Sequence, residues 1–318
     1  MDLIIDQLIK NGNHYKNIKN YDAMINCYLK AIDQNSDKAM YNLAVHYKNM
    51  SDYDNMIKYY EMAINSGNKD ALSELIEYYK HLICYYNTIE HDKDKLIVIY
   101  KNLIDLGDVD AMRNLAEYYK DDENYEYDEN YDLMKKYYLM AIDNGDIDAM
   151  FQLGEYYQNT EINYDLMKKY YLMAIEKGDI DAMCQLGEYY HITEINYDLM
   201  KKYYLMAIEK GDSDAMFILA GYYHITEKNY DLMKKYYLMA IEKDNSDAMF
   251  ILGGYYHITE INYDLMKKYY LMAIEKGNSD AMFQLGYYYQ NTEINYDLMK
   301  KYYLMAIEKG NSDVMTNL

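Results

Sequence analysis

The chain has 318 residues and contains 46 Tyr and 25 Met but neither Pro nor Trp. With 51% hydrophobic residues it is too apolar to be intrinsically disordered, despite a formal net charge of −21. This acidic balance argues against nucleic acid and anionic membranes as partners, because both need a basic protein surface, and it favours a basic or amphipathic protein partner.

One segment repeats along the chain from about residue 20 onward. Three diverged copies come first, at Tyr21–Ile32, Tyr53–Ile64 and Lys93–Ile104. Six near-identical copies of Tyr-Asp-Leu-Met-Lys-Lys-Tyr-Tyr-Leu-Met-Ala-Ile follow at intervals of 33 residues, starting at Tyr131, Tyr164, Tyr197, Tyr230, Tyr263 and Tyr296. A second segment alternates with the first and begins at Asp37, Asp70, Asp110, Asp148, Asp181, Asp214, Asp247 and Asp280. The repeating unit is therefore two short elements joined by two short loops.

Both elements have the apolar periodicity of helices. On the first element the apolar face consists of Ala149, Leu153, Gly154 and Tyr157. On the second element the predicted apolar stripe consists of Tyr164, Met167, Tyr171, Ala174 and Ile175. The methionines predicted to fill the core are Met140, Met173, Met206 and Met239.

The ends of the predicted helices carry the expected signals. Asn163 precedes the second helix and is predicted to cap its first turn. Gly178 follows the same helix, where a left-handed residue ends it, and glycine recurs at this position in most repeats. Asp244 interrupts that series, so we predict a modest local cost in stability there.

Helices this short bury little apolar surface alone, so neighbouring pairs must stack to form a continuous core. We therefore predict an all-α fold, a right-handed α-solenoid of stacked antiparallel helix pairs that forms one domain over residues 1–318. Residues 1–130 hold the diverged repeats, with longer loops between Tyr79 and Lys93 and between Tyr119 and Tyr131, and residues 131–318 hold the near-identical ones. The second insertion, residues 121–129, is acidic and is interpreted as a solvated loop, with contact to a basic partner as the alternative.

A motif of small and aromatic residues recurs in every repeat. It reads Ala-x3-Leu-Gly-x2-Tyr and then Tyr-Tyr-x2-Ala-(Ala/Ile)-x2-Gly, and one copy consists of Ala149, Leu153, Gly154, Tyr157, Tyr170, Tyr171, Ala174, Ile175 and Gly178. This motif resembles the Sel1-like repeat, a relative of the tetratricopeptide repeat, over residues from about 20 to 318. The resemblance implies a non-catalytic protein–protein interaction scaffold or adaptor. The chain lacks the family's glycine shortly after the first-helix tyrosine, and its residue usage is similar to that of repeat proteins of giant amoebal viruses.

No catalytic or metal-binding constellation emerges from the sequence, so we predict a protein that is not an enzyme and needs no cofactor or metal. His191, His224 and His257 recur at one repeat position, but equivalent residues of stacked helices lie roughly 10 Å apart. One metal ion would need each nitrogen within about 2.1 Å. We therefore interpret them as helix-end or loop residues.

The expected compartment follows from the cysteines and the apolar runs. The three cysteines are odd in number and irregular in spacing, which favours a reducing, intracellular compartment such as the cytoplasm (the host cytoplasm if the protein is viral). The apolar runs are too short for a membrane span, so no membrane partner is expected.

The near-identical repeats differ mainly on one face of the first helix, at positions offset by 0, 3 and 7. In the related folds the first helices line the concave surface, so we predict that a protein or peptide partner binds there. The fifteen predicted partner-binding residues are Gln152, Glu155, Asn159, Gln185, Glu188, Ile192, Ile218, Gly221, Ile225, Ile251, Gly254, Ile258, Gln284, Tyr287 and Asn291. Recent duplication of residues 215–247 and 248–280 is the alternative explanation for the shared Ile, Gly and Ile.

The last residues suggest a second function. Asp313-Val-Met-Thr-Asn-Leu318 begins another first helix without a polar capping repeat. Solenoid arrays normally need polar caps, so this end is a candidate for self-association, and the alternative function is a structural or assembly protein. A short final helix that caps the array adequately is the simpler interpretation.

Overall fold

A computed structural model of the protein describes residues 2–90, 93–121, 127–312 and 314. Within these ranges the regular elements are eighteen α-helices and one short π-helical segment, which confirms the predicted all-α fold of helix pairs. The chain divides into two compact parts, Met1–Ala149 and Met150–Leu318. The proposal that both parts form one continuous domain stays a prediction.

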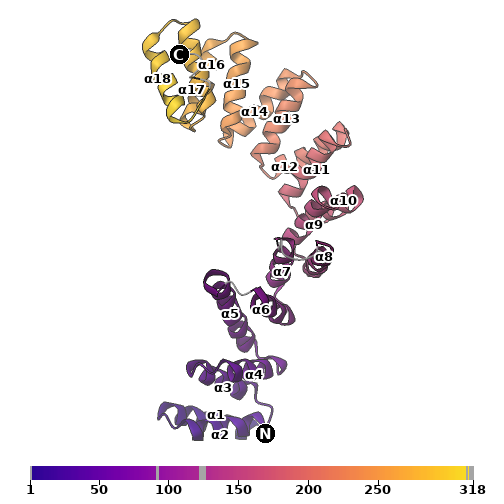
Figure 1. The fold of residues 1–318 in the computed structure, drawn as a ribbon, viewed down its shortest axis with the longest axis vertical. Helices are drawn as coiled ribbons and strands as arrows, with labels where there is room; N and C mark the ends of the chain where they lie inside the picture. Colours follow the sequence, from indigo (N-terminus) through magenta and orange to yellow (C-terminus); the bar gives the residue numbers. More distant parts are fainter. Residues whose placement is uncertain (1, 91–92, 122–126, 313, 315–318) are drawn as a thin grey trace. The chain divides into compact units, whose positions relative to one another are not determined.

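The first part contains the diverged repeats (Figure 1). Its helices are α1 (Asp2–Asn17), α2 (Tyr21–Ile32), α3 (Asp37–Asn49), α4 (Tyr53–Asn65), α5 (Lys69–Tyr85), α6 (Lys93–Asp105), α7 (Val109–Asp121) and α8 (Tyr127–Asp143). A π-helical segment, Tyr86–Glu90, follows α5. Consecutive helices pack as pairs, such as α1 with α2 and α3 with α4, and each pair then packs on the next.

The second part contains the near-identical repeats except for the copy on α8, which belongs to the first part, and the part boundary falls inside α9. Its helices are α9 (Ile147–Asn159), α10 (Tyr164–Glu176), α11 (Ile180–Ile192), α12 (Tyr197–Glu209), α13 (Ser213–Ile225), α14 (Tyr230–Glu242), α15 (Ser246–Ile258), α16 (Tyr263–Glu275), α17 (Ser279–Asn291) and α18 (Tyr296–Glu308). The odd-numbered helices are the first helices of their repeats, and the even-numbered ones are the second helices. Within this part they follow one another in chain order (Figure 1).

Side-chain caps and left-handed residues set the helix ends, as predicted. The Asn163 side chain accepts a hydrogen bond from the backbone N–H of Leu166 at 3.1 Å and so satisfies one free donor of the first turn of α10. At the other end Gly178 has φ +92°, and the N–H of the next residue bonds to the carbonyl of Ala174 at 3.1 Å. This pairing closes the last turn of the helix.

Asp244 occupies the glycine position after α14 with φ +66°, a left-handed conformation that glycine adopts without strain. We expect Asp244→Gly to raise the free energy of unfolding by about 1 kcal/mol, because the Cβ penalty disappears. The ion pair of Asp244 with Lys276, at 2.6 Å, is lost, but Asp244 is largely exposed and the pair contributes little. Chemical unfolding followed by circular dichroism would measure the change. The converse variant Gly211→Asp should lower stability, and a stabilised Gly211→Asp would contradict this account.

The core of each repeat is built from tyrosine rings set against small residues. The ring of Tyr171 in α10 lies on Gly154 of α9, where an added Cβ would be only 2.6 Å from the ring. Tyr157 and Tyr170 stack with their ring centroids 5.8 Å apart and their planes 9° apart. Leu153 is fully buried beside them. Glycine therefore leaves room at this position for the ring to pack directly on the backbone of α9.

A polar clasp joins each repeat of the second part to the next. Lys201 of α12 donates to Glu227, in the loop after α13, at 3.0 Å, and the Tyr222 hydroxyl donates to the same carboxylate oxygen at 3.0 Å. The Lys201 bond lowers the pKa of the Glu227 carboxyl. The equivalent lysine–glutamate pairs are Lys168–Glu194, Lys234–Glu260 and Lys267–Glu293.

Several sequence predictions were wrong in detail. Tyr164 was predicted in the apolar stripe but is 38% exposed, because its ring packs on Tyr189 of the following repeat and not inside its own. Tyr170, which the stripe omitted, is buried. The methionines Met140, Met173, Met206 and Met239 are only half-buried. Among the described residues, the fully buried methionines are Met24, Met56, Met134, Met167, Met200, Met233 and Met266.

The first insertion is not the long loop that the sequence predicted. α5 continues to Tyr85 and passes into the π-helical segment, because the residues after Tyr79 include no glycine, proline or other helix breaker. α1 was also missed. It is the first helix of an additional pair, in which the Tyr28 ring lies on Gly12 and the Tyr28 hydroxyl donates to Asn13 at 2.6 Å.

Two predictions fall outside the described residues. One is the contact role of the acidic insertion, residues 121–129, whose side chains the structure does not describe. The other is self-association through residues 313–318, of which only residue 314 is described.

Candidate partner-binding face

The fifteen predicted partner-binding residues lie on the first helices of the second part, three each on α9, α11, α13, α15 and α17. All of them are exposed or half-buried. We call this surface the first-helix face. Offsets of 0, 3 and 7 place the three residues of each helix on one side of it. The prediction that a partner binds this face is not tested by the fold.

The middle of this face is apolar and contains glycine. Ile225 and Ile258 are 76% and 79% exposed, so water covers most of each side chain. Ile218 is 36% exposed. We call the six residues of α13 and α15 the Ile–Gly strip: Ile218, Gly221, Ile225, Ile251, Gly254 and Ile258.

Aromatic contacts join neighbouring first helices beside the strip. The ring of His224 in α13 meets Tyr255 of α15 edge-on, with centroids 5.8 Å apart. His257 meets Tyr288 of α17 in the same way at 5.9 Å. These histidines lie in the last turns of their helices, as predicted, and burial lowers the pKa of His257. α13, α15 and α17 are therefore direct neighbours across the face.

Four tyrosines at one position of the second helices have hydroxyls that lie against a first helix: Tyr171, Tyr237, Tyr270 and Tyr303. Near the edges of the first-helix face the hydroxyl is paired, since Tyr171 donates to Gln158 at 2.7 Å and Tyr303 donates to Gln290 at 2.6 Å. In the middle, histidine replaces that glutamine. Tyr237 and Tyr270 have no hydrogen-bond partner for their hydroxyls among the described residues.

The charges of the face differ between its edge and its middle. Burial raises the pKa of Tyr171, and the carboxylates of Glu155 and Glu188 raise it further. Burial alone raises the pKa of Tyr237 and of Tyr270 to about 12. Glycine stands at residues 221 and 254, where the earlier repeats carry glutamate. The acidic residues therefore lie toward α9 and α11.

Tyr237 and Tyr270 are absent from the predicted face because tyrosine is constant at their position, a pattern that predicts core packing. One signal in the sequence does distinguish them. The repeats of α11, α13 and α15 have histidine in place of the glutamine at the position of Gln158. Two of them, the repeats of α13 and α15, also have glycine at residues 221 and 254.

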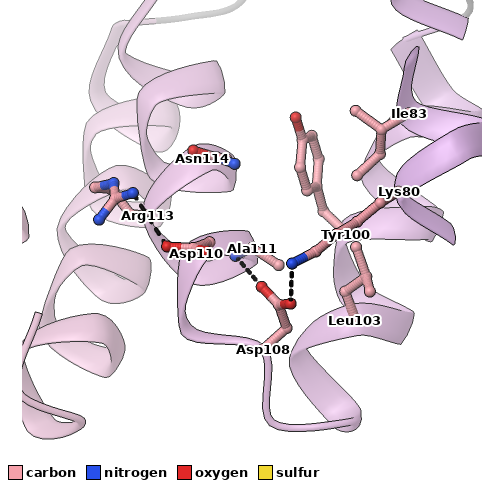
Figure 2. Close-up of a pocket in the computed structure, with 9 residues that line it drawn as sticks. All are labelled: Lys80, Ile83, Tyr100, Leu103, Asp108, Asp110, Ala111, Arg113 and Asn114. Atoms are coloured by element: carbon pink, nitrogen blue, oxygen red, sulfur yellow. Dashed lines mark hydrogen bonds and ion pairs between the residues drawn. The ribbon is translucent and has the colours of Figure 1, made fainter. Parts of the chain in front are cut away.

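A second candidate is a pocket of about 400 Å³ in the first part, lined by α5, α6 and α7 (Figure 2). Its lining residues are Lys80, Ile83, Tyr100, Leu103, Asp108, Asp110, Ala111, Arg113 and Asn114.

Structural pairs account for the charges of this pocket. Lys80 binds Asp108 at 2.8 Å, and Asp108 also accepts from the backbone N–H of Ala111 at 2.9 Å as the cap of α7 (Figure 2). Arg113 binds Asp146 at 2.5 Å and Asp110 at 3.2 Å. Because these groups already hold one another, the pocket offers no ready acid or base for catalysis.

Metal-ligating side chains and thiols elsewhere in the described chain are the remaining candidates for chemistry. Within it, no group of three or more His, Cys, Asp or Glu side chains is placed to hold a metal ion. Burial and the nearby Asp212 carboxylate raise the pKa of the Cys184 thiol to about 12, which keeps it protonated and unreactive. Among the helices that the structure describes, none combines the length and the apolar character that a membrane span needs.

Solved structures share this architecture. A protective antigen from uropathogenic Escherichia coli strains with an SLR fold aligns with 99% of this chain and 71% of its own, with a TM-score of 0.58 and 20% identity. The fold is that of Sel1-like repeat proteins. A Sel1 repeat protein from Oxalobacter formigenes aligns with 73% of this chain and 99% of its own, with a TM-score of 0.51 and 22% identity. No protein-family model and no curated protein matches the sequence.

Proposed function

We propose that the protein is a non-catalytic interaction scaffold that binds a partner polypeptide on the first-helix face. The observation that carries the proposal is the Ile–Gly strip, where Ile225 and Ile258 are more than three-quarters exposed on adjacent helices. Exposed aliphatic side chains gathered on one surface favour a protein contact over bare solvation. The Sel1-like fold supports the same class of function, and the giant-virus likeness of the residue usage would place the protein in host cytoplasm.

The alternative, recent duplication, explains why the two central repeats agree, but it does not explain their apolar surface. A variant can separate the two interpretations. We expect the triple variant Ile218→Asp, Ile225→Asp and Ile258→Asp to lose a specific partner, because each carboxylate would be desolvated on binding. Ile251 is left unchanged since it is half-buried, and its replacement would perturb the fold.

The control carries the same charge on another exposed surface. Ile195, Ile261 and Ile294 lie in the loops after first helices and are 63%, 63% and 55% exposed. Replacing these three with Asp should leave partner capture unchanged. The measurement is quantitative mass spectrometry of proteins retained by each immobilised chain, with sedimentation to record self-association. Equal retention by both variants would overturn the proposal, and concentration-dependent mass of the chain alone would support an assembly protein instead.

A further inference from the structure

Two buried hydroxyl groups open onto the Ile–Gly strip. The side chains of Tyr237 and Tyr270 are each 2% exposed, and their hydroxyls have no hydrogen-bond partner among the described residues. Each hydroxyl oxygen keeps a small contact with solvent. Each hydroxyl is therefore reachable from outside although its ring is part of the core.

The glycines of the strip create these openings. A Cβ added at Gly221 would lie 3.8 Å from the Tyr237 hydroxyl, and one added at Gly254 would lie 3.7 Å from the Tyr270 hydroxyl. Both are ordinary contact distances, so neither glycine is required by packing. Glycine inside a helix costs roughly 0.5–1 kcal/mol relative to alanine. Its effect here is to leave the hydroxyl uncovered.

The neighbouring glycine positions differ in this respect. At Gly253 an added Cβ would lie 2.7 Å from the Tyr270 ring, so packing accounts for that glycine. In the repeats toward the edges, the hydroxyls of Tyr171 and Tyr303 are already bonded to glutamine. The combination of a free hydroxyl and a missing side chain is therefore specific to the repeats of α13 and α15.

We propose that the hydroxyls of Tyr237 and Tyr270 bind main-chain groups of an extended partner segment that lies across the Ile–Gly strip, with a basic residue of that segment over Glu155 and Glu188. The inference rests on the proposed function and specifies the chemistry of its partner. A polypeptide laid on isoleucine side chains loses water from its backbone, and each unpaired N–H or C=O is costly. A tyrosine hydroxyl can donate to a carbonyl or accept from an N–H, so it meets that need.

The spacing of the two hydroxyls selects the conformation of the segment. They occupy equivalent positions one repeat apart, and we infer a separation of about 8–10 Å, the usual spacing of stacked helices. A polyproline-II segment advances about 3.1 Å per residue with three residues per turn, so it presents equivalent groups about every 9 Å on one side. A β-strand has a two-residue period and does not match this interval. The partner should therefore carry apolar residues at three-residue intervals.

The charges of the face determine which end of the bound segment should be basic. Glu188 on α11 is exposed, and Glu155 on α9 is half-buried and close enough to Tyr171 to raise its pKa. At the opposite end α17 presents the uncharged residues Gln284 and Tyr287. A lysine or arginine is therefore favoured at the end of the segment that reaches α11 and α9.

The test uses the full chain and a phage-displayed library of random dodecapeptides. Enriched peptides would be synthesised with a fluorescent label, and their Kd would be measured by anisotropy. We expect apolar residues three apart and a basic residue at one end. The double variant Tyr237→Phe and Tyr270→Phe removes only the two hydroxyls and should weaken binding about tenfold. The matched control Tyr171→Phe and Tyr303→Phe removes hydroxyls already bonded to glutamine and should change Kd less than twofold.

The outcomes separate this inference from the proposed function. If the triple aspartate variant abolishes binding but the Tyr237→Phe and Tyr270→Phe variant binds normally, the face binds peptides and the hydroxyl inference is wrong. If no peptide is enriched, or the aspartate variant still binds, both ideas are wrong. Enriched peptides with a two-residue apolar period or an acidic end would also overturn the proposed partner chemistry. Gly221→Ala with Gly254→Ala should weaken binding as the loss of the hydroxyls does, because the added methyl groups cover them.

Discussion

Raising the pH above 10 should unfold the protein cooperatively. Burial raises the pKa of Tyr222, Tyr237 and Tyr270 from the usual 10.0 to about 12, and it raises the pKa of Tyr171 and Tyr204 as well. A raised folded-state pKa means that the folded protein holds the proton more tightly than the unfolded chain. The resulting stability is fully present below pH 10 and is lost as the pH rises through the folded-state values.

The size of this effect comes from the number of such tyrosines. A pKa raised from 10.0 to about 12 corresponds to roughly 3 kcal/mol per tyrosine once the pH exceeds the folded value. Losses from several repeats add, and a domain is typically stable by only about 5–15 kcal/mol. Circular dichroism and tyrosinate absorbance, recorded together from pH 8 to pH 13, should therefore change together above pH 10.

A variant with fewer ionisable core residues provides the control. Phenylalanine cannot ionise, so Tyr237→Phe with Tyr270→Phe should move the alkaline unfolding midpoint to higher pH. Helix loss that begins well below pH 10, or full tyrosinate absorbance with intact helices, would show that the buried rings do not govern this transition.

Removing one core ring should destabilise the protein more than any substitution at an exposed or half-buried residue. Tyr204 is 2% exposed, and its ring lies on Gly187, where an added Cβ would be 3.0 Å from the ring. Tyr204→Ala leaves a cavity whose opposite wall is helix backbone, so no side chain at Gly187 can relax into it. We expect a loss of about 3–5 kcal/mol, the upper range for deletion of a large core side chain.

The adjacent residue supplies a matched control. Leu205 belongs to the same helix and is 37% exposed, so Leu205→Ala should cost much less. Chemical unfolding followed by helical circular dichroism would compare the midpoints of the two variants. Similar shifts for both would mean that helix propensity outweighs packing between α11 and α12.

The architecture could be predicted from the sequence because the same capping, helix-ending and apolar residues recur in one repeat after another. Capping by Asn163 and the left-handed conformations of Gly178 and Asp244 are short-range effects of single residues, and the structure confirms them. The stability cost at Asp244 stays a prediction. Tyr164 was misplaced because periodicity identifies an apolar face but not the repeat against which it packs. α1 was missed because only Gly12 and a few neighbours retain the motif.

The loops and the candidate site were less predictable, for a different reason. Ile195 and Ile294 adopt φ +52° and +51°, a left-handed conformation that is unusual for a β-branched residue, at loops without the glycine of the family pattern. In both loops the N–H of the next residue bonds to a carbonyl of the preceding helix at 2.8 Å, which closes the helix end despite the unfavourable backbone conformation. The variable positions of the first-helix face were found by comparing repeats, but the hydroxyls beneath Gly221 and Gly254 belong to constant tyrosines. Comparison of repeats cannot reveal a residue that never varies.

The polar clasp between repeats also bears on how such a chain changes in length. Every clasp joins a lysine to a glutamate 26 residues later, and the near-identical repeats use the same residue types for it. Unequal recombination between near-identical coding segments inserts or deletes multiples of 33 residues. In each resulting chain the repeats on both sides of the junction keep a lysine and a glutamate 26 residues apart. An insertion of any other size between them displaces the lysine from its glutamate. The array is therefore free to lengthen or shorten by whole repeats, and a gained copy of the α13 or α15 repeat would extend the Ile–Gly strip with it.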